Sequence, residues 1–237
     1  MNFSARGTMA SAVSVFILLA ISAVSVPAQK KSRTVDAARH ASAAAKTFTE
    51  IMNVRDKAIP KELLDKAEAI AVFPGVIKAA FIVGGRGGQG IISKRVMRGW
   101  SAPAFFNLSG GSFGAQIGAQ KNDYIFLIMN EEGVKGLLED KFEMGGEAGA
   151  VAGPVGREVA ASTNTTLDAG ILSYSRSKGA FIGAALKGAV ISPDNDLNEA
   201  IYGMKATQVL TGKPMPLNKM PPSVRILPRT LARYSVR

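Results

Sequence analysis

The chain has 237 residues, 47% of them hydrophobic, and a formal net charge of +11 at pH 7. This length and composition suit one packed domain with terminal segments and exclude wholesale disorder. The sequence has no cysteine and only one histidine, which excludes disulfide frameworks and zinc sites built from cysteine and histidine.

Residues 1–28 have the pattern of a secretory signal peptide. Arg6 precedes the apolar stretch "MASAVSVFILLAISAVSV", and "VPA" places small residues before a cleavage point that would leave Gln29 first. A retained membrane anchor is the alternative, although the stretch is short for a bilayer that needs roughly 20 apolar residues. We expect an exported protein of the periplasm or outer envelope surface, associated peripherally with membrane.

Two amphipathic helices are predicted next. Residues 34–58 repeat apolar side chains at helical spacing, and residues 29–43 form the lead-in of this helix. The stripe consists of Val35, Ala38, Ala41, Ala45, Phe48 and Met52. Pro60 is expected to begin the second helix, "PKELLDKAEA".

After Ala69 the sequence favours β-strands. "FGAQIGAQ" and "YIFLIMN" predict an antiparallel hairpin whose tight turn is "KND", residues 121–123. Further strands are expected in "KAAFIVG", "GIISKRVM", "APAFFNL", "GEAGAVAG", "AGILSYSR" and "GAFIGAALKGAVIS", and short helices in "EEGVKGLLED" and "DNDLNEAIYGM". The predicted fold is α+β: an antiparallel β-sheet or barrel-like core with N-terminal amphipathic helices and short C-terminal helices. Residues 213–237 form a basic, proline-rich tail without acids, expected to be extended, mobile and packed only in part.

Three short motifs suggest chemistry that their surroundings do not support. "GRGGQG" places Gly85, Gly87 and Gly90 as in a dinucleotide fingerprint, but neither a helix nor an acid about 20 residues later follows. We interpret the segment as a glycine-rich turn between two strands that exposes Arg86, and a phosphate group suits such a turn.

"GGSFG" around Ser112 resembles a nucleophile elbow, but no histidine follows it; His40 lies upstream and is expected to be an exposed helix residue. "DNDLNE" resembles a calcium loop, yet Glu199 stands where the turn needs glycine, so Asp194 is expected to begin a helix instead. We therefore expect no catalytic residues, no metal and no cofactor.

Positive charge is concentrated between Ala69 and Asn122, a segment without any acid. Such a block favours a polyanion, and for an exported protein anionic lipid is a better candidate than nucleic acid; a solvated positive surface is the alternative. Alternation in "IISKRVMRGW" would place Lys94 and Arg98 beside Trp100 and turn Arg95 to the other face, although Trp100 equally suits the core. The candidate lipid-binding residues are Arg86, Lys94, Arg95, Arg98, Lys78 and Trp100.

Several blocks from about residue 44 to residue 212 resemble the SYLF domain family. They are "GGRGGQG", "GWSAPAFF", "SFGAQIGAQKNDYIFLIMN", "GGEAGAVAGPVGRE", "SYSRSKGAFIGAALKGAVI" and "NEAIYG". The resemblance implies a non-catalytic lipid-binding module. In eukaryotic members it accompanies SH3 or FYVE domains and binds phosphoinositides and actin, whereas bacterial members are exported and stand alone. For this chain we expect binding to anionic phospholipid and consider actin an unlikely partner. The alternative is a structural or interaction factor of the envelope with an acidic protein partner.

Overall fold

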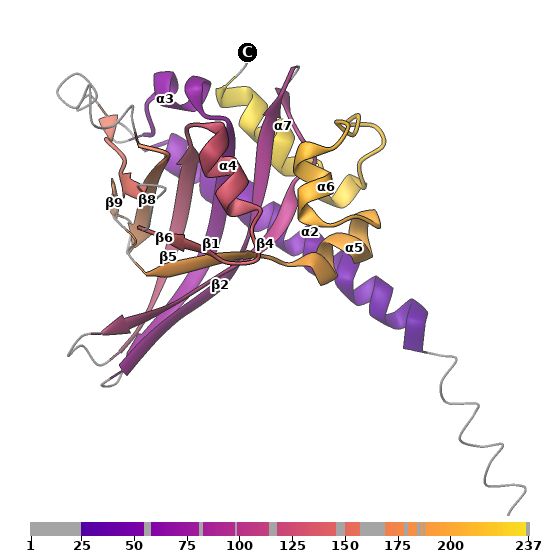
Figure 1. The fold of residues 1–237 in the computed structure, drawn as a ribbon, viewed down its shortest axis with the longest axis horizontal. Helices are drawn as coiled ribbons and strands as arrows, with labels where there is room; N and C mark the ends of the chain where they lie inside the picture. The colour runs from indigo at the N-terminus through magenta and orange to yellow at the C-terminus, as the bar shows by residue number, and fades with distance from the viewer. Residues whose placement is uncertain are drawn as a thin grey trace, which may run out of the picture.

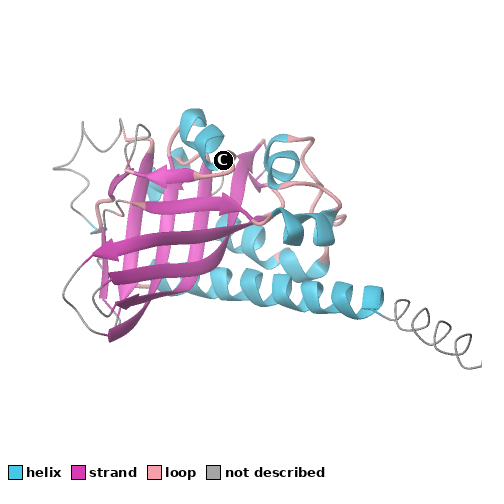
Figure 2. Cartoon of the chain, turned by 60° about the horizontal axis from the view of Figure 1, so that its bottom comes forward, coloured by secondary structure: helices cyan, strands magenta, loops and turns pink. Residues whose placement is uncertain are grey.

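The structure is a computed structural model that describes residues 25–54, 58–80, 83–97, 99–113, 118–145, 150–156, 169–177, 180–183, 186 and 188–235. A long helix, α2 (Ser25–Met52), runs along one side of a strongly curved ten-stranded sheet (Figures 1 and 2). The expected α+β fold with a barrel-like core is confirmed. Most of the predicted signal segment lies outside the described residues, and its removal stays a prediction.

The sheet has the strand order β6-β10-β4-β2-β1-β5-β8-β7. Its strands are β1 (Ala69–Ala80), β2 (Val83–Val96), β3 (Gly99–Trp100), β4 (Ala104–Phe113), β5 (Gly118–Ile128), β6 (Phe142–Met144), β7 (Ala150–Ala152), β8 (Ile171–Ser177), β9 (Ala180–Gly183) and β10 (Ala189–Pro193). β3 pairs with β2 and β9 with β8, while β7 is parallel to β8. The order interleaves early and late strands: β2 pairs with its neighbours in the sequence, whereas β1, β4 and β5 each have a partner far away in the chain.

Strand alternation gives the sheet two separate cores. The first core lies between the sheet and α2 with α7 (Ile226–Tyr234), and it includes Phe48, Ile70 and Leu231. The second core lies on the inner face of the curved sheet, where α4 (Glu131–Leu137) and α6 (Ala206–Thr211) also pack. In Figure 1, α4 crosses in front of the strands that this core lines.

α2 packs closely because its buried face is built mainly from alanine. Ala37, Ala41, Ala44 and Ala45 are buried, followed by Phe48 and Ile51 at the C-terminal end. The predicted stripe was therefore wrong at its start, since Val35 is exposed. The second helix, α3 (Lys61–Lys66), follows Pro60 as expected but is shorter than predicted.

The C-terminal segment is structured, contrary to the expectation of an extended tail. After α5 (Asn195–Tyr202) and α6, the 3-10 helix η2 (Pro222–Val224) leads into α7. Leu227 and Leu231 of α7 are completely buried, and the Phe48 and Tyr234 rings meet edge to face at 5.7 Å. Proline and basic residues suggested mobility, but leucines at helical spacing let this segment complete the first core.

The glycine-rich segment "VGGRGGQGII" is a strand rather than a turn. All of it belongs to β2, which pairs with β1 on one side and β4 on the other. A Cβ atom added at Gly90 would lie 2.4 Å from Cδ1 of Phe73, so here glycine allows the strand to pass close over an aromatic ring. Arg86 is therefore not at a bend, as we had predicted, but inside a strand.

The predicted hairpin with a turn at residues 121–123 is also wrong. β5 continues through these residues, and β1 lies between β5 and β2. Asp123 is accommodated in the strand because its carboxylate accepts hydrogen bonds from the Gly75 backbone N–H and from the Arg176 guanidinium. Gly75 belongs to an irregularity in β1 and has a φ of 62°, a conformation that favours glycine.

Candidate functional site

Two cations lie directly opposite each other near the end of the sheet farthest from α7. Lys78 of β1 pairs with Arg86 of β2, and the same row continues to Gly110 of β4 and Gln120 of β5. Directly paired residues share a face, and Gly110 pairs in turn with Ala189 of the second core. The Lys78–Arg86 pair therefore lies on the inner face of the curved sheet, just beyond that core.

Small residues leave room for this pair. Gly110 carries no side chain, and a Cβ atom there would lie 3.5 Å from Cγ of Arg86, so the arginine stem extends across the glycine. Gly84 and Gly88, two residues to either side of Arg86 in β2, share its face. The strand pattern thus surrounds Arg86 with glycines, which leave room for its long side chain.

The electrostatics of the pair are unfavourable in the isolated chain. Like charges directly opposite each other on neighbouring strands repel. Among the residues that the structure describes, neither Lys78 nor Arg86 forms an ion pair. The Nε atom of Arg86 is buried and has no hydrogen-bond partner within the described part of the chain. An anion placed between the two side chains would relieve the repulsion and accept this hydrogen bond.

The opposite face of the same strand ends adds a third cation and an exposed apolar side chain. Lys121 of β5 is exposed and pairs with Ile77 of β1, which is 55% exposed. Asp123, two residues later in β5, is already engaged by Arg176, whose Nη2 also lies 2.6 Å from Glu50. We call Lys78, Arg86, Lys121 and Ile77 the basic end of the sheet.

The other predicted lipid-binding residues do not join the basic end. The Lys94 side chain is 20% exposed, and its Nζ lies 4.0 Å from Oε1 of Glu131. Arg98 lies outside the described residues. Arg95 and Trp100 are buried in the first core region, 8% and 5% exposed.

The predicted face that joined Lys94 to Trp100 was wrong. β2 ends at Val96, the chain reverses, and β3 returns beside it so that Trp100 pairs with Arg95. The Arg95 guanidinium lies 4.2 Å from the centroid of the Trp100 ring and donates hydrogen bonds to Ala67 O, Leu64 O and Ser235 Oγ. These contacts make Arg95 a link between α3, the sheet and the C-terminal end of the described chain.

A polar cavity of about 630 Å³ lies between α2 and the sheet. His40 lines it and is half-buried rather than exposed as predicted. Burial disfavours the imidazolium and the neighbouring Arg39 adds repulsion, so the pKa of His40 is lowered from its usual value of 6.5. Within the described part of the chain, no three histidine or acidic side chains converge as metal ligands would.

The three short motifs lack the structural context of the sites that they resemble, although "GRGGQG" lies in a strand and not in the predicted turn. Gly85, Gly87 and Gly90 lie within one strand, so no helix N-terminus is present to receive a pyrophosphate. Ser112 lies in β4 rather than at a strand-to-helix turn. Asp194 caps α5 by accepting a hydrogen bond from the Leu197 backbone N–H, as expected for a helix start.

Comparison with known proteins identifies the family. The sequence model of the Ysc84 family, described as "Las17-binding protein actin regulator", matches residues 109–234. The chain belongs to this SYLF family. The yeast "Protein YSC84" (Saccharomyces cerevisiae) is 33% identical over 214 residues, which is 87% of this chain and 44% of that protein. "LAS seventeen-binding protein 3", also from Saccharomyces cerevisiae, is 32% identical over 185 residues, covering 76% of this chain and 40% of that protein.

Animal members of the SYLF family are similar to the chain as well. "SH3 domain-containing YSC84-like protein 1" of Xenopus laevis is 32% identical over 195 residues, covering 79% of this chain and 57% of that protein. The chain thus spans about half the length of these curated relatives. The names of these relatives refer to binding or to an SH3 domain and not to an enzymatic activity.

Sequence reasoning missed Ile77 and Lys121 as partners in the basic end of the sheet. Strict alternation places Ile77 on the same face as the buried Phe73, but the irregularity at Pro74–Gly75 shifts the register and exposes it. The Pro-Gly dipeptide was the available signal for such a bulge.

Among the described residues, no helix has the length and apolar character needed to cross a membrane.

Proposed function

We propose that this chain is an exported, non-enzymatic protein of the cell envelope that binds anionic phospholipid at the basic end of the sheet. The observation that carries the proposal is the Lys78–Arg86 pair. Its two cations are held side by side by strand pairing, without an ion-pair partner among the described residues, and the buried Arg86 Nε has no hydrogen-bond partner.

A phosphodiester headgroup has the chemistry that this pair lacks. It carries a negative charge and several strong acceptor oxygens, so it can meet both Lys78 and the guanidinium of Arg86. Lys121 would add attraction to neighbouring headgroups, and the exposed Ile77 would enter the boundary between headgroups and acyl chains. Each cation near an anionic surface contributes about 1 kcal/mol.

The family supports a binding role, and it also supplies the second candidate. The name of one yeast relative and the description of the family both refer to binding of Las17, so a protein partner is named for members of the family. On this chain, the acid-free segment between residues 69 and 122 would face an acidic partner through the same basic end. A vesicle-binding assay distinguishes the phospholipid from the acidic protein partner.

The test uses the full chain after processing and vesicles of phosphatidylcholine with or without phosphatidylglycerol. We expect flotation only with the anionic vesicles. The double variant Lys78→Gln/Arg86→Gln is expected to weaken binding about 30-fold, from about 1 kcal/mol per cation. The control Lys135→Gln/Lys141→Gln makes the same change in net charge at two exposed lysines near α4 and is expected to bind almost normally.

Raising the salt concentration should weaken the binding of the wild-type chain, because exposed charges are screened beyond a Debye length. Equal binding by wild type and the Lys78/Arg86 variant would remove the basic end from the proposal. Absence of flotation with either vesicle would favour the acidic protein partner. N-terminal sequencing of exported protein tests the localisation, with Gln29 as the expected first residue and Met1 as the contradictory result.

A further inference from the structure

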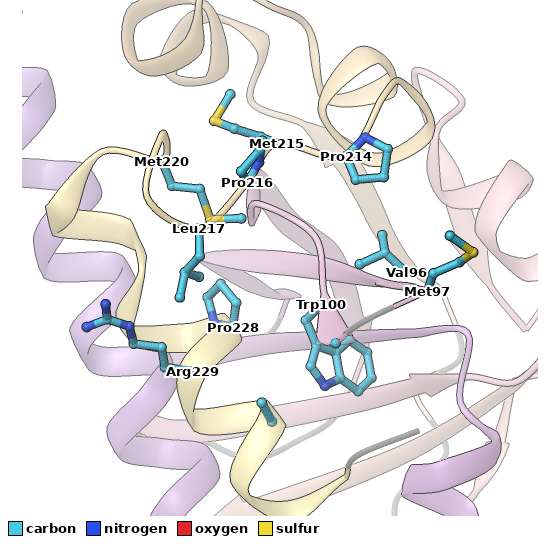
Figure 3. A pocket seen from close by; sticks show the side chains of 12 residues that line it. Val96, Met97, Trp100, Pro214, Met215, Pro216, Leu217, Met220, Pro228 and Arg229 are labelled. Carbon is cyan, nitrogen blue, oxygen red and sulfur yellow. The ribbon is translucent and has the colours of Figure 1, made fainter.

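An apolar pocket of about 390 Å³ opens at the other end of β2 (Figure 3). Three segments distant in sequence form it: the turn from β2 into β3, the segment between α6 and η2, and one face of α7. Its lining includes Val96, Met97, Trp100, Met215, Leu217 and Arg229. The volume falls within the range of about 300–1,000 Å³ that is typical of small-molecule sites.

The pocket presents apolar surface to solvent. Met97 is 97% exposed at the tip of the β2–β3 turn, and Leu217 on the facing segment is 38% exposed. Met220, which also lines the pocket, is almost completely buried. Methionine side chains adapt their shape to a bound apolar group more readily than branched side chains do.

The polar N–H group of Trp100 already has a partner within the protein, which leaves its hydrocarbon surface for an apolar ligand. Its indole N–H donates to the Ser235 carbonyl at 3.4 Å, and Arg95 stacks over its ring. The polar edge of the indole is therefore satisfied inside the protein, and a ligand in the pocket needs to offer it only hydrocarbon.

The charge at the pocket has one sign. Among the lining residues that the structure describes, Arg229 is the only charged one, and in Figure 3 its guanidinium lies at the outer edge, away from Trp100. Residues 213–237 include six basic residues and no acid. An apolar interior with a cationic rim complements an amphiphile that has one hydrocarbon chain and an anionic head.

We propose that this pocket binds a long-chain fatty acid, with the acyl chain between Met97, Leu217 and Trp100 and the carboxylate at Arg229. The site is separate from the basic end of the sheet. Arg86 and Val96 lie ten residues apart in one strand, a span of roughly 33 Å at about 3.3 Å per residue. One lipid chain cannot bridge both, so either proposal can fail without the other.

The experiment uses dodecanoate, below its micelle-forming concentration, and the emission of Trp100, the only tryptophan of the chain and part of the pocket. We expect saturable binding of dodecanoate, weaker binding of dodecanol, and the weakest binding of dodecyltrimethylammonium. Butyrate, which has the same carboxylate and a short chain, is expected to leave the emission unchanged. Equal binding of the three twelve-carbon probes, or none up to the solubility limit of dodecanoate, would overturn the proposal.

Substitutions test the binding site of the carboxylate and that of the acyl chain separately. Arg229→Gln is expected to weaken dodecanoate binding about fivefold, the effect of one partly exposed charge pair, and to leave dodecanol unchanged. Its matched control is Arg233→Gln, an exposed residue one turn later on α7 that does not line the pocket. If Arg233→Gln weakens binding as much as Arg229→Gln, the carboxylate site is wrong.

Met97→Asp places a carboxylate on the apolar wall at a position too exposed to affect folding. We expect at least about tenfold weaker binding of dodecanoate, from lost apolar contact and charge repulsion. Unchanged affinity in this variant contradicts the placement of the chain. A concentration-dependent dimer that Met97→Asp disrupts, with no fatty-acid binding, would assign the pocket to a second copy and overturn the proposal.

Discussion

Replacing Arg95 with methionine is expected to destabilise the folded chain and to leave vesicle binding intact. In the structure, Arg95 Nε donates to Ala67 O at 2.9 Å, and its Nη2 donates to Leu64 O at 2.6 Å and Ser235 Oγ at 2.8 Å. The guanidinium also covers the ring of Trp100. Methionine keeps much of the stem volume and removes the charge and these donors.

The magnitude follows from what methionine leaves behind. The Ala67 carbonyl loses its side-chain donor, and the Leu64 carbonyl keeps only the Ser235 hydroxyl at 3.2 Å, whose single proton it shares with Asp65 Oδ1 at 2.8 Å. A buried polar group left without a partner costs about 1–3 kcal/mol, and a hydrogen bond to a charged group contributes about 1.5–3 kcal/mol. Removing a buried charge offsets part of this loss. We therefore expect the free energy of unfolding to fall by about 2–3 kcal/mol.

Urea unfolding measures this change, with Trp100 emission and circular dichroism as two probes that should coincide. The midpoint is expected to fall without a change in slope, because the surface exposed on unfolding is the same. Arg233→Met, at an exposed position of α7, is the control and should stay within about 0.5 kcal/mol of wild type. A folded Arg95→Met variant with normal stability but weakened binding to anionic vesicles would refute the structural role and return Arg95 to the lipid site.

Two further predictions concern the close passage of β2 and the half-buried histidine. Gly90→Ala should lower the free energy of unfolding by about 2 kcal/mol or more, since the added Cβ atom would lie 2.4 Å from the Phe73 ring. At Gly87 an added Cβ atom would meet no atom within 4 Å, so Gly87→Ala should change the free energy of unfolding by less than about 1 kcal/mol. Urea unfolding compares them, and equal effects would contradict the close approach. The pKa of His40 should lie below its value in the unfolded chain, because burial disfavours the imidazolium and Arg39 repels it. The unfolded chain therefore binds the proton more readily than the folded chain. The stability that neutral His40 contributes is then lost as the pH falls below about 6.5. NMR titration of the single histidine, folded and in urea, checks this; a folded pKa at or above the unfolded one contradicts its place in the polar cavity.

The class of fold and the family could both be predicted from the amino-acid sequence. Helical spacing predicted α2, a proline marked the start of α3, and an aspartate marked the N-terminus of α5. These signals are local, because a capping side chain or an apolar stripe acts on residues within a few positions of itself. The prediction that no helix follows "GRGGQG" is likewise confirmed, since the segment continues as β2.

Which cations lie together could not be predicted, because it depends on strand register and on the path of the folded chain. Lys78 and Arg86 meet because β1 and β2 pair in one register, and Trp100 turns toward Arg95 because a short β3 reverses beside β2. The polar residues 121–123 indicated a turn. In the structure they continue a strand, because the Asp123 carboxylate accepts hydrogen bonds from Arg176 and the Gly75 backbone N–H. β1 and β2 follow each other in the sequence, but the position of the turn between them was not predicted, and a shift of one residue in register exchanges the two faces of a strand. The sequence shows that the charge is present, but the face on which it lies depends on this register and on the irregularity at Pro74–Gly75.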